Sequence, residues 1–178
     1  MQNVHATPRY DRALAAIADL LGRLRLEFAF AGSVARSAWL GSMIDSGALD
    51  VIVLMNAEQK NEVAMMANNR GFRLDRDEVA RTEELDLIPM SFVDSDGDVR
   101  VHVLVASNAL YARMIKNSVE AGTAKVVTAE DLALMCSLGE DDDSQRAAKM
   151  LIHLPEFDRA AYNARLVSIG LSEFVVNT

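Results

Sequence analysis

Cysteine is almost absent from this chain, since Cys136 is the only one among 178 residues. A single cysteine cannot form a disulfide within the chain, and such usage is typical of proteins in a reducing compartment. Long hydrophobic runs are also missing, so the sequence predicts no membrane-spanning helix. Residues 1–5 are polar and lack the apolar core of a signal peptide. These absences predict a cytoplasmic protein that does not associate with membranes.

An excess of basic residues is missing as well. The chain has 18 lysines and arginines against 26 acidic residues, which gives a net charge of -8. Broad nucleic-acid binding needs a basic surface to contact phosphates, so we do not expect it here. Aromatic residues make up only 6% of the chain, too few for a platform on which bases stack.

The pattern of apolar residues predicts a mixed α/β protein. Helical spacing indicates helices over residues 13–24, 34–40 and 57–70. Short apolar runs indicate strands over residues 26–31, 49–55 and 72–74. Two further runs, 88–93 and 99–106, flank an Asp-Gly pair and predict a hairpin.

The last third of the chain has a helical pattern from residue 106 onward. Thr128 is predicted as the N-cap of a helix, and Asp131 stands at the third position of that helix. Two more helices are expected over residues 144–154 and 157–169. We therefore expect a small twisted mixed sheet with flanking helices on one face, over residues 1–106. A helical C-terminal segment, residues 107–178, packs on it to give one compact unit.

The residues with the clearest chemical meaning follow the first predicted strand. Gly32 and Ser33 form a turn into a helix, where bare backbone N–H groups favour phosphate. Arg36 follows on the same helix and could meet a triphosphate. Asp50 is the one acidic residue in the next apolar strand, where it could hold a divalent cation against that phosphate. The same turn is also typical of a plain strand-to-helix connection with Ser33 as N-cap, and Asp50 could equally form a structural ion pair.

This arrangement resembles the nucleotidyltransferase superfamily, which has the DNA polymerase β-like fold, and in particular the AbiEii-type and related minimal nucleotidyltransferases. The resemblance covers about residues 10–170, with the turn at Gly32 and Ser33, a helix that ends at Gly41, and the run of valine, threonine, glutamate, aspartate and leucine at residues 127–132. It implies a fold and an ancestral activity: transfer of a nucleoside monophosphate from a nucleoside triphosphate to a hydroxyl on protein or RNA. Mg²⁺ or Mn²⁺ with the triphosphate would be the cofactor.

The catalytic carboxylates of that family largely do not match. Counted from Gly41, the two acidic positions of the family's strand fall on Ala48 and Asp50, and the third carboxylate position falls on His102. Two Mg²⁺ ions need a set of oxygen ligands, which Ala48 cannot supply, and the imidazole of His102 is a softer ligand. We therefore predict a nucleotidyltransferase-like protein with reduced or lost catalysis, with Asp50 as the one metal ligand and Gly32, Ser33 and Arg36 as the phosphate-binding residues.

Two alternatives follow from the same residues. In the first, the chain is a non-enzymatic interaction module, toxin–antitoxin-like or regulatory, that binds a protein partner through the degenerate cleft. In the second, Asp50 and His102 face each other and act as a base or share one metal ion; His102 can also be an ordinary histidine on a half-buried strand.

Overall fold

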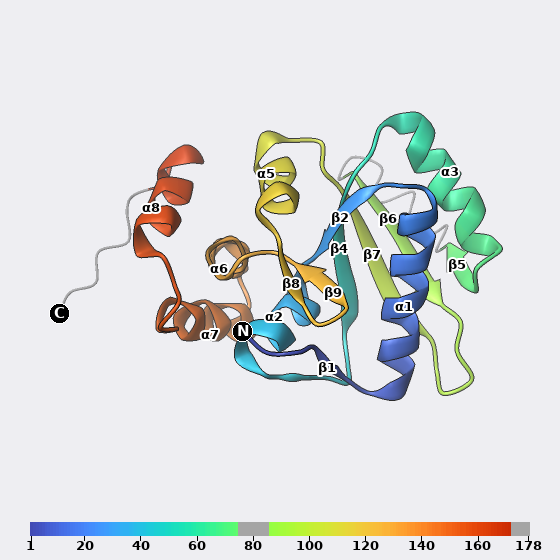
Figure 1. Ribbon diagram of the computed structural model, residues 1–178, viewed down its shortest axis with the longest axis horizontal. Coiled ribbons are helices and arrows are strands. Elements are labelled where there is room, and N and C mark those ends of the chain that lie inside the picture. The colour runs from blue at the N-terminus through green and yellow to red at the C-terminus, as the bar shows by residue number, and fades with distance from the viewer. Residues whose placement is uncertain (75–85, 172–178) are drawn as a thin grey trace. The chain divides into compact units, whose positions relative to one another are not determined.

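The computed structural model describes residues 1–74 and 86–171 (Figure 1). The chain divides into two compact units, and the second begins at Thr128. The first unit is a mixed α/β fold, as the sequence predicts, and contains every candidate site residue. Within the described residues no helix is both long enough and apolar enough to cross a membrane.

The first unit is built on a seven-stranded mixed sheet in the order β5-β6-β7-β4-β2-β9-β8. β2 pairs antiparallel with β4, and β4 pairs parallel with β7. A second, two-stranded sheet pairs β1 with β3 in parallel. The strands are β1 (His5–Ala6), β2 (Glu27–Phe30), β3 (Met43–Ile44), β4 (Ala48–Leu54), β5 (Phe72–Leu74), β6 (Leu87–Phe92), β7 (Val99–Val105), β8 (Val119–Ala121) and β9 (Ala124–Val126).

Four described helices belong to this unit. They are α1 (Pro8–Arg23), α2 (Gly32–Leu40), α3 (Ala57–Asn68) and α5 (Ala109–Asn117). α1 packs on β2, β7 and α3, whereas α5 packs on β2 and β4. In Figure 1, α1 and α5 lie on opposite sides of these strands. Helices therefore flank both faces of the sheet, and the expectation of helices on one face is wrong.

Alternation along β7 explains which side of the sheet is fully covered. Val99, Val101 and Val103 are completely buried, while Arg100 is exposed and His102 is half-buried. Successive side chains of a strand point to opposite faces, so the valines belong to one face and Arg100 and His102 to the other. The second face is covered less completely at this end of β7, and this is where the candidate site lies.

Most predicted elements of the first unit are confirmed, and the β6–β7 hairpin is among them. β1, β3, β8 and β9 were not predicted from the sequence. β8 and β9 form a hairpin whose second strand pairs parallel with β2 through Phe30 and Val126. Residues 119–126 thus extend the sheet, where the sequence pattern predicted helical structure. The first unit consequently runs to Val127, whereas the sequence analysis expected the core to end at residue 106.

The second unit consists of three described helices: α6 (Ala129–Leu138), α7 (Asp142–Ile152) and α8 (Arg159–Ser168). α6 packs on both α7 and α8. Thr128 is the N-cap of α6, as predicted, and its hydroxyl oxygen accepts the Asp131 backbone N–H at 3.2 Å. Asp131 is completely buried and accepts a hydrogen bond from Arg165 of α8 at 2.5 Å. The acidic residue of the valine–threonine–glutamate–aspartate–leucine run therefore ties two helices of this unit together.

Candidate functional site

The site begins at the turn between β2 and α2. Gly32 has φ +48°, in the left-handed region that favours glycine. Gly41, with φ +71°, ends α2 as its C-cap, as the sequence predicts. α2 is thus held between two glycines. Its N-terminus follows directly from the end of β2, and this fixes where its first backbone N–H groups lie.

Asp50 on β4 lies directly against this turn. The backbone N–H of Ala31 donates to the Asp50 carbonyl at 2.9 Å, so the turn and the strand are joined. A Cβ added to Gly32 would overlap Oδ2 of Asp50 and lie 3.0 Å from its Cγ. Only glycine leaves room for the carboxylate here. The carboxylate therefore lies beside the first residue of α2, where the helix dipole favours negative charge.

His102 is the partner of Asp50. The two residues are register partners in the parallel pair β4–β7, and His102 Nδ1 is 3.0 Å from Asp50 Oδ1. About 30% of the Asp50 side chain and 28% of the His102 side chain are exposed, so the pair is open to solvent on one side. At this distance the Nδ1–H of His102 can donate to the Asp50 carboxylate, from either a neutral imidazole or an imidazolium. The sequence-based possibility that Asp50 and His102 face each other is confirmed.

Ser33 has a different role from the N-cap that the sequence suggested. The N-cap of α2 is Ala31, which offers no side-chain hydrogen bond, and Ser33 is the second residue of the helix. The Ser33 hydroxyl donates to the carbonyl oxygen of Ala48 at 3.0 Å. Ser33 therefore anchors α2 to the start of β4. Its backbone N–H remains in the uncapped first turn of α2, where an anion can accept it.

Arg36 and Arg100 supply positive charge in this part of the molecule. Arg36 is half-buried and lies three residues beyond Ser33 on α2, a spacing that places the two on the same side of the helix. Arg100, which the sequence analysis did not single out, is the register partner of Ala48 on β7. It shares the strand face of His102. The alternation of valine with arginine and histidine over residues 99–103 was the signal that could have found it.

The residues present do not fit the pair of magnesium ions that the resemblance implies. Ala48 offers no ligand, and one oxygen of Asp50 is engaged by His102. Within residues 1–74 and 86–171 no group of three or more His, Cys, Asp or Glu side chains could hold a metal ion. Mg²⁺ requires near-octahedral oxygen coordination, which one paired carboxylate does not provide.

A guanidinium with orphaned donors lies on α5, the helix that packs on β4. Nε and Nη2 of Arg113 are buried and have no hydrogen-bond partner among the described residues. Buried donors are normally satisfied by protein, water or a bound ion. Two donors of Arg113 are therefore left unsatisfied within the part of the chain that the structure describes.

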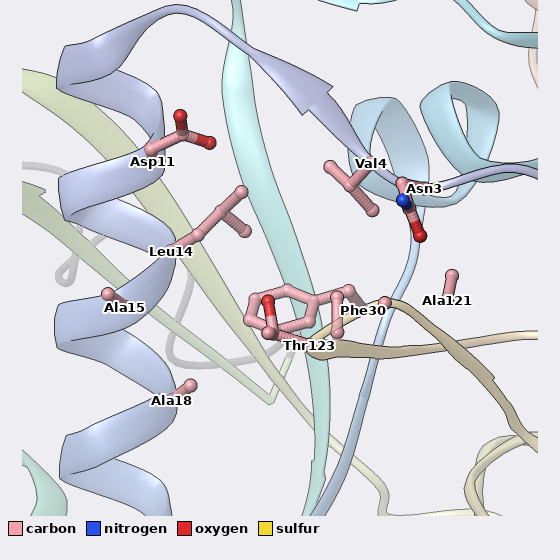
Figure 2. Close-up of a pocket in the computed structure, with 11 residues that line it drawn as sticks. Asn3, Val4, Asp11, Leu14, Ala15, Ala18, Phe30, Ala121 and Thr123 are labelled. Carbon is pink, nitrogen blue, oxygen red and sulfur yellow. The ribbon is translucent and has the colours of Figure 1, made fainter.

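A cavity of about 590 Å³ lies elsewhere in the first unit, between α1, the chain before β1 and the β8–β9 turn (Figure 2). Phe30, Leu14 and Val4 give it an apolar lining, and Asp11 and Thr123 add polar groups. Gly32, Asp50 and His102 do not line it. The cavity is therefore distinct from the candidate site.

Comparison with known proteins adds no relative: no protein-family model matches the chain, and no curated protein matches it significantly.

Proposed function

We propose that this chain is a nucleotidyltransferase-like protein that binds a nucleoside triphosphate at the turn between β2 and α2 and has reduced or lost transfer activity. The observation that supports this most directly is the N-terminus of α2, which has no side-chain cap and begins at the left-handed turn of Gly32. A glycine turn that leads into an uncapped helix N-terminus presents backbone N–H groups that can bind phosphate.

We assign phosphate binding to main-chain N–H groups and to a basic side chain. The N–H groups of Gly32 and Ser33 point from the first turn of α2, which has no acidic residue and no side-chain cap. Arg36 adds a cation one turn further along the same helix. Such groups can bind phosphate even when nucleotidyl transfer is lost, because the positions of the donors are fixed by the fold.

We expect weakened nucleotidyl transfer because Ala48 and His102 stand at two of the three positions where the family that the chain resembles has carboxylates. Nucleotidyl transfer in the family that the chain resembles uses two metal ions to stabilise the attacking and leaving oxygens. With one carboxylate, already paired to His102, the site lacks the charge to hold both ions. Loss of such electrostatic stabilisation costs about two to three powers of ten in rate for a single group, so the loss of two ligands should be severe.

Thermal unfolding in the presence of ATP, GTP, CTP or UTP tests the proposal. Trp39 is the only tryptophan and lies on α2, so its fluorescence reports on the first unit. We expect at least one nucleotide to raise the unfolding temperature. The nucleotide-induced rise in unfolding temperature should be smaller in Arg36→Gln. It should be unchanged in Arg146→Gln, which removes the same charge from an exposed position on α7.

No shift with any of the four nucleotides would overturn the proposed function. A protein partner whose binding is unaffected by nucleotide would then support the interaction module instead.

A further inference from the structure

We infer that the site recognises the phosphate chain of the nucleotide without a divalent cation, with Arg100 beside Ala48, a position where the resemblance expects a metal ligand. The inference rests on the proposed function, because it concerns how that same site binds its ligand. It starts from the disagreement between the residues present and a magnesium centre.

The strand register places Arg100 in the site. Ala48 pairs with Arg100 and Asp50 pairs with His102 in the parallel strands β4 and β7. Partners in a parallel ladder point to the same side of the sheet, and neighbouring strands are about 4.8 Å apart. Ala48, Asp50, Arg100 and His102 therefore form one patch of adjacent positions. Asp50 is the only acidic member of that patch.

The charge of this patch suits an anion better than a cation. Asp50 is the single carboxylate, and His102 engages one of its oxygens at 3.0 Å while the other lies against Gly32. Arg100 is exposed, and its guanidinium adds a positive charge beside Ala48, where the family that the chain resembles has a negative one. A guanidinium repels Mg²⁺ and binds phosphate through two parallel hydrogen bonds.

This arrangement changes what a triphosphate needs in order to bind. In a site with three carboxylates, metal ions must neutralise the repulsion between protein and phosphates. Here the single carboxylate of Asp50 is paired with His102. Arg100 is the register partner of Ala48, and α2 contributes Arg36 and the uncapped N–H groups of its first turn. The phosphates therefore meet net positive charge without any metal ion.

Calorimetric titration of the full chain with ATP tests this directly, once in EDTA and once in MgCl₂. We expect ATP to bind in EDTA at least as tightly as in MgCl₂, because no protein carboxylate draws the ion into the complex and Mg²⁺ lowers the negative charge of the phosphates. Arg100→Gln should weaken binding in EDTA by about tenfold or more, as expected for loss of a charge-assisted hydrogen bond. Arg146→Gln is the matched control, since it removes the same charge from an exposed position on α7.

Restoring the carboxylates should make ATP binding depend on a divalent metal ion. The double variant Ala48→Asp with His102→Asp should bind Mn²⁺ measurably in electron paramagnetic resonance, and its ATP binding should require the ion. The control Ala160→Asp with His153→Asp makes the same changes at two exposed positions. The unaltered chain and this control should leave Mn²⁺ free. Circular dichroism of the double variant checks that it is folded.

The outcomes separate the inference from the proposed function. ATP binding that is abolished by EDTA in the unaltered chain, or left unchanged by Arg100→Gln, would overturn the metal-independent recognition and leave nucleotide binding standing. Absence of ATP binding under both conditions, together with no response to the other three nucleotides, would overturn the proposed function and the inference with it.

Discussion

The carboxylate of Asp50 occupies the space that a side chain at Gly32 would need. Asp50 and Gly32 are 18 positions apart in the chain, yet Oδ2 of Asp50 lies where the Cβ of any other residue 32 would project. The left-handed φ of +48° at Gly32 adds a second demand for glycine. The conformation of the turn and the position of the only site carboxylate therefore depend on each other.

Gly32→Ala should destabilise the first unit strongly. The left-handed backbone alone costs a non-glycine residue about 1 kcal/mol, and the overlap with Asp50 should add about 1 to 3 kcal/mol as for other overpacked sites. Gly47→Ala is the matched control, because Gly47 has φ +81° and an added Cβ there meets nothing within 4 Å. Urea unfolding followed by Trp39 fluorescence measures the free energy of unfolding of both variants.

Removing the carboxylate should relieve the overlap. In the background Asp50→Ala, the cost of Gly32→Ala should fall most of the way to that of Gly47→Ala, since the carboxylate is gone and only the Cβ of residue 50 remains close, at 3.3 Å. Equal costs for Gly32→Ala and Gly47→Ala in the unaltered chain would show that the carboxylate does not restrict this turn.

Much of the fold could be predicted because its signals are local. Helices such as α1 and α6 follow from apolar spacing and from a capping threonine, and the β6–β7 hairpin follows from two alternating runs around a turn. The β8–β9 hairpin carries no such signal. Its strands contain alanine, glutamate and lysine, which have low strand propensity, and pairing of β9 with β2 stabilises them from outside.

The site could be predicted only in part for a related reason. Gly32 and Asp50 were found because a glycine turn and an acidic residue in an apolar strand stand out in sequence. Asp50 and His102 are 52 positions apart, and their proximity depends on the register of β4 and β7, which no local pattern specifies. The alternation over residues 99–103 could have indicated the strand face of Arg100, but its position beside Ala48 again depends on the strand register.

Ser33→Ala should destabilise the first unit by about 1 kcal/mol, the usual value of one hydrogen bond. The Ser33 hydroxyl donates to the Ala48 carbonyl and ties α2 to β4, 15 positions later in the chain. Ser46→Ala is the control, because the Ser46 hydroxyl bonds only to the neighbouring and exposed Asp45. Trp39 fluorescence in urea again reports the difference. Equal midpoints for the two variants would argue against an anchoring role for Ser33.

In the second unit, Asp131→Ala should be far more damaging than loss of a surface ion pair. Asp131 is completely buried and the side chain of Arg165 is 10% exposed, so the variant leaves a guanidinium buried without its carboxylate. Breaking one side of such a pair costs about 3 to 5 kcal/mol.

Asp143→Ala provides the comparison, because the pair Arg146–Asp143 is exposed and such pairs contribute about 0 to 1 kcal/mol. Far-ultraviolet circular dichroism in urea follows both variants. The double variant Asp131→Leu with Arg165→Met should recover part of the loss, since it removes both charges together. A double variant as unstable as Asp131→Ala would mean that the helices α6 and α8 depend on the hydrogen bonds themselves.

The loop between β6 and β7 should make the first unit sensitive to acid. Arg12 on α1 donates two hydrogen bonds to Asp94, both at 2.7 Å, and a third to Asp96. The Arg12 hydrogen bonds, with help from the Asp96 backbone N–H, lower the pKa of Asp94 from 3.8 to about 2. Because the folded pKa is below the ordinary value, the Asp94 carboxylate stabilises the fold above pH 3.8. That contribution is lost as the pH falls toward 2.

Urea midpoints measured by Trp39 fluorescence between pH 5 and pH 2 should therefore fall less steeply in Asp94→Asn than in the unaltered chain. Asp143→Asn serves as the control, because its carboxylate is 78% exposed on α7 and pairs only with Arg146. The control should keep the slope of the unaltered chain. The same slope in all three proteins would show that the contact between α1 and this loop contributes nothing to acid stability. A slope reduced only in Asp94→Asn would identify the Arg12–Asp94 pair as the acid-sensitive link between the first helix and the strand that carries His102.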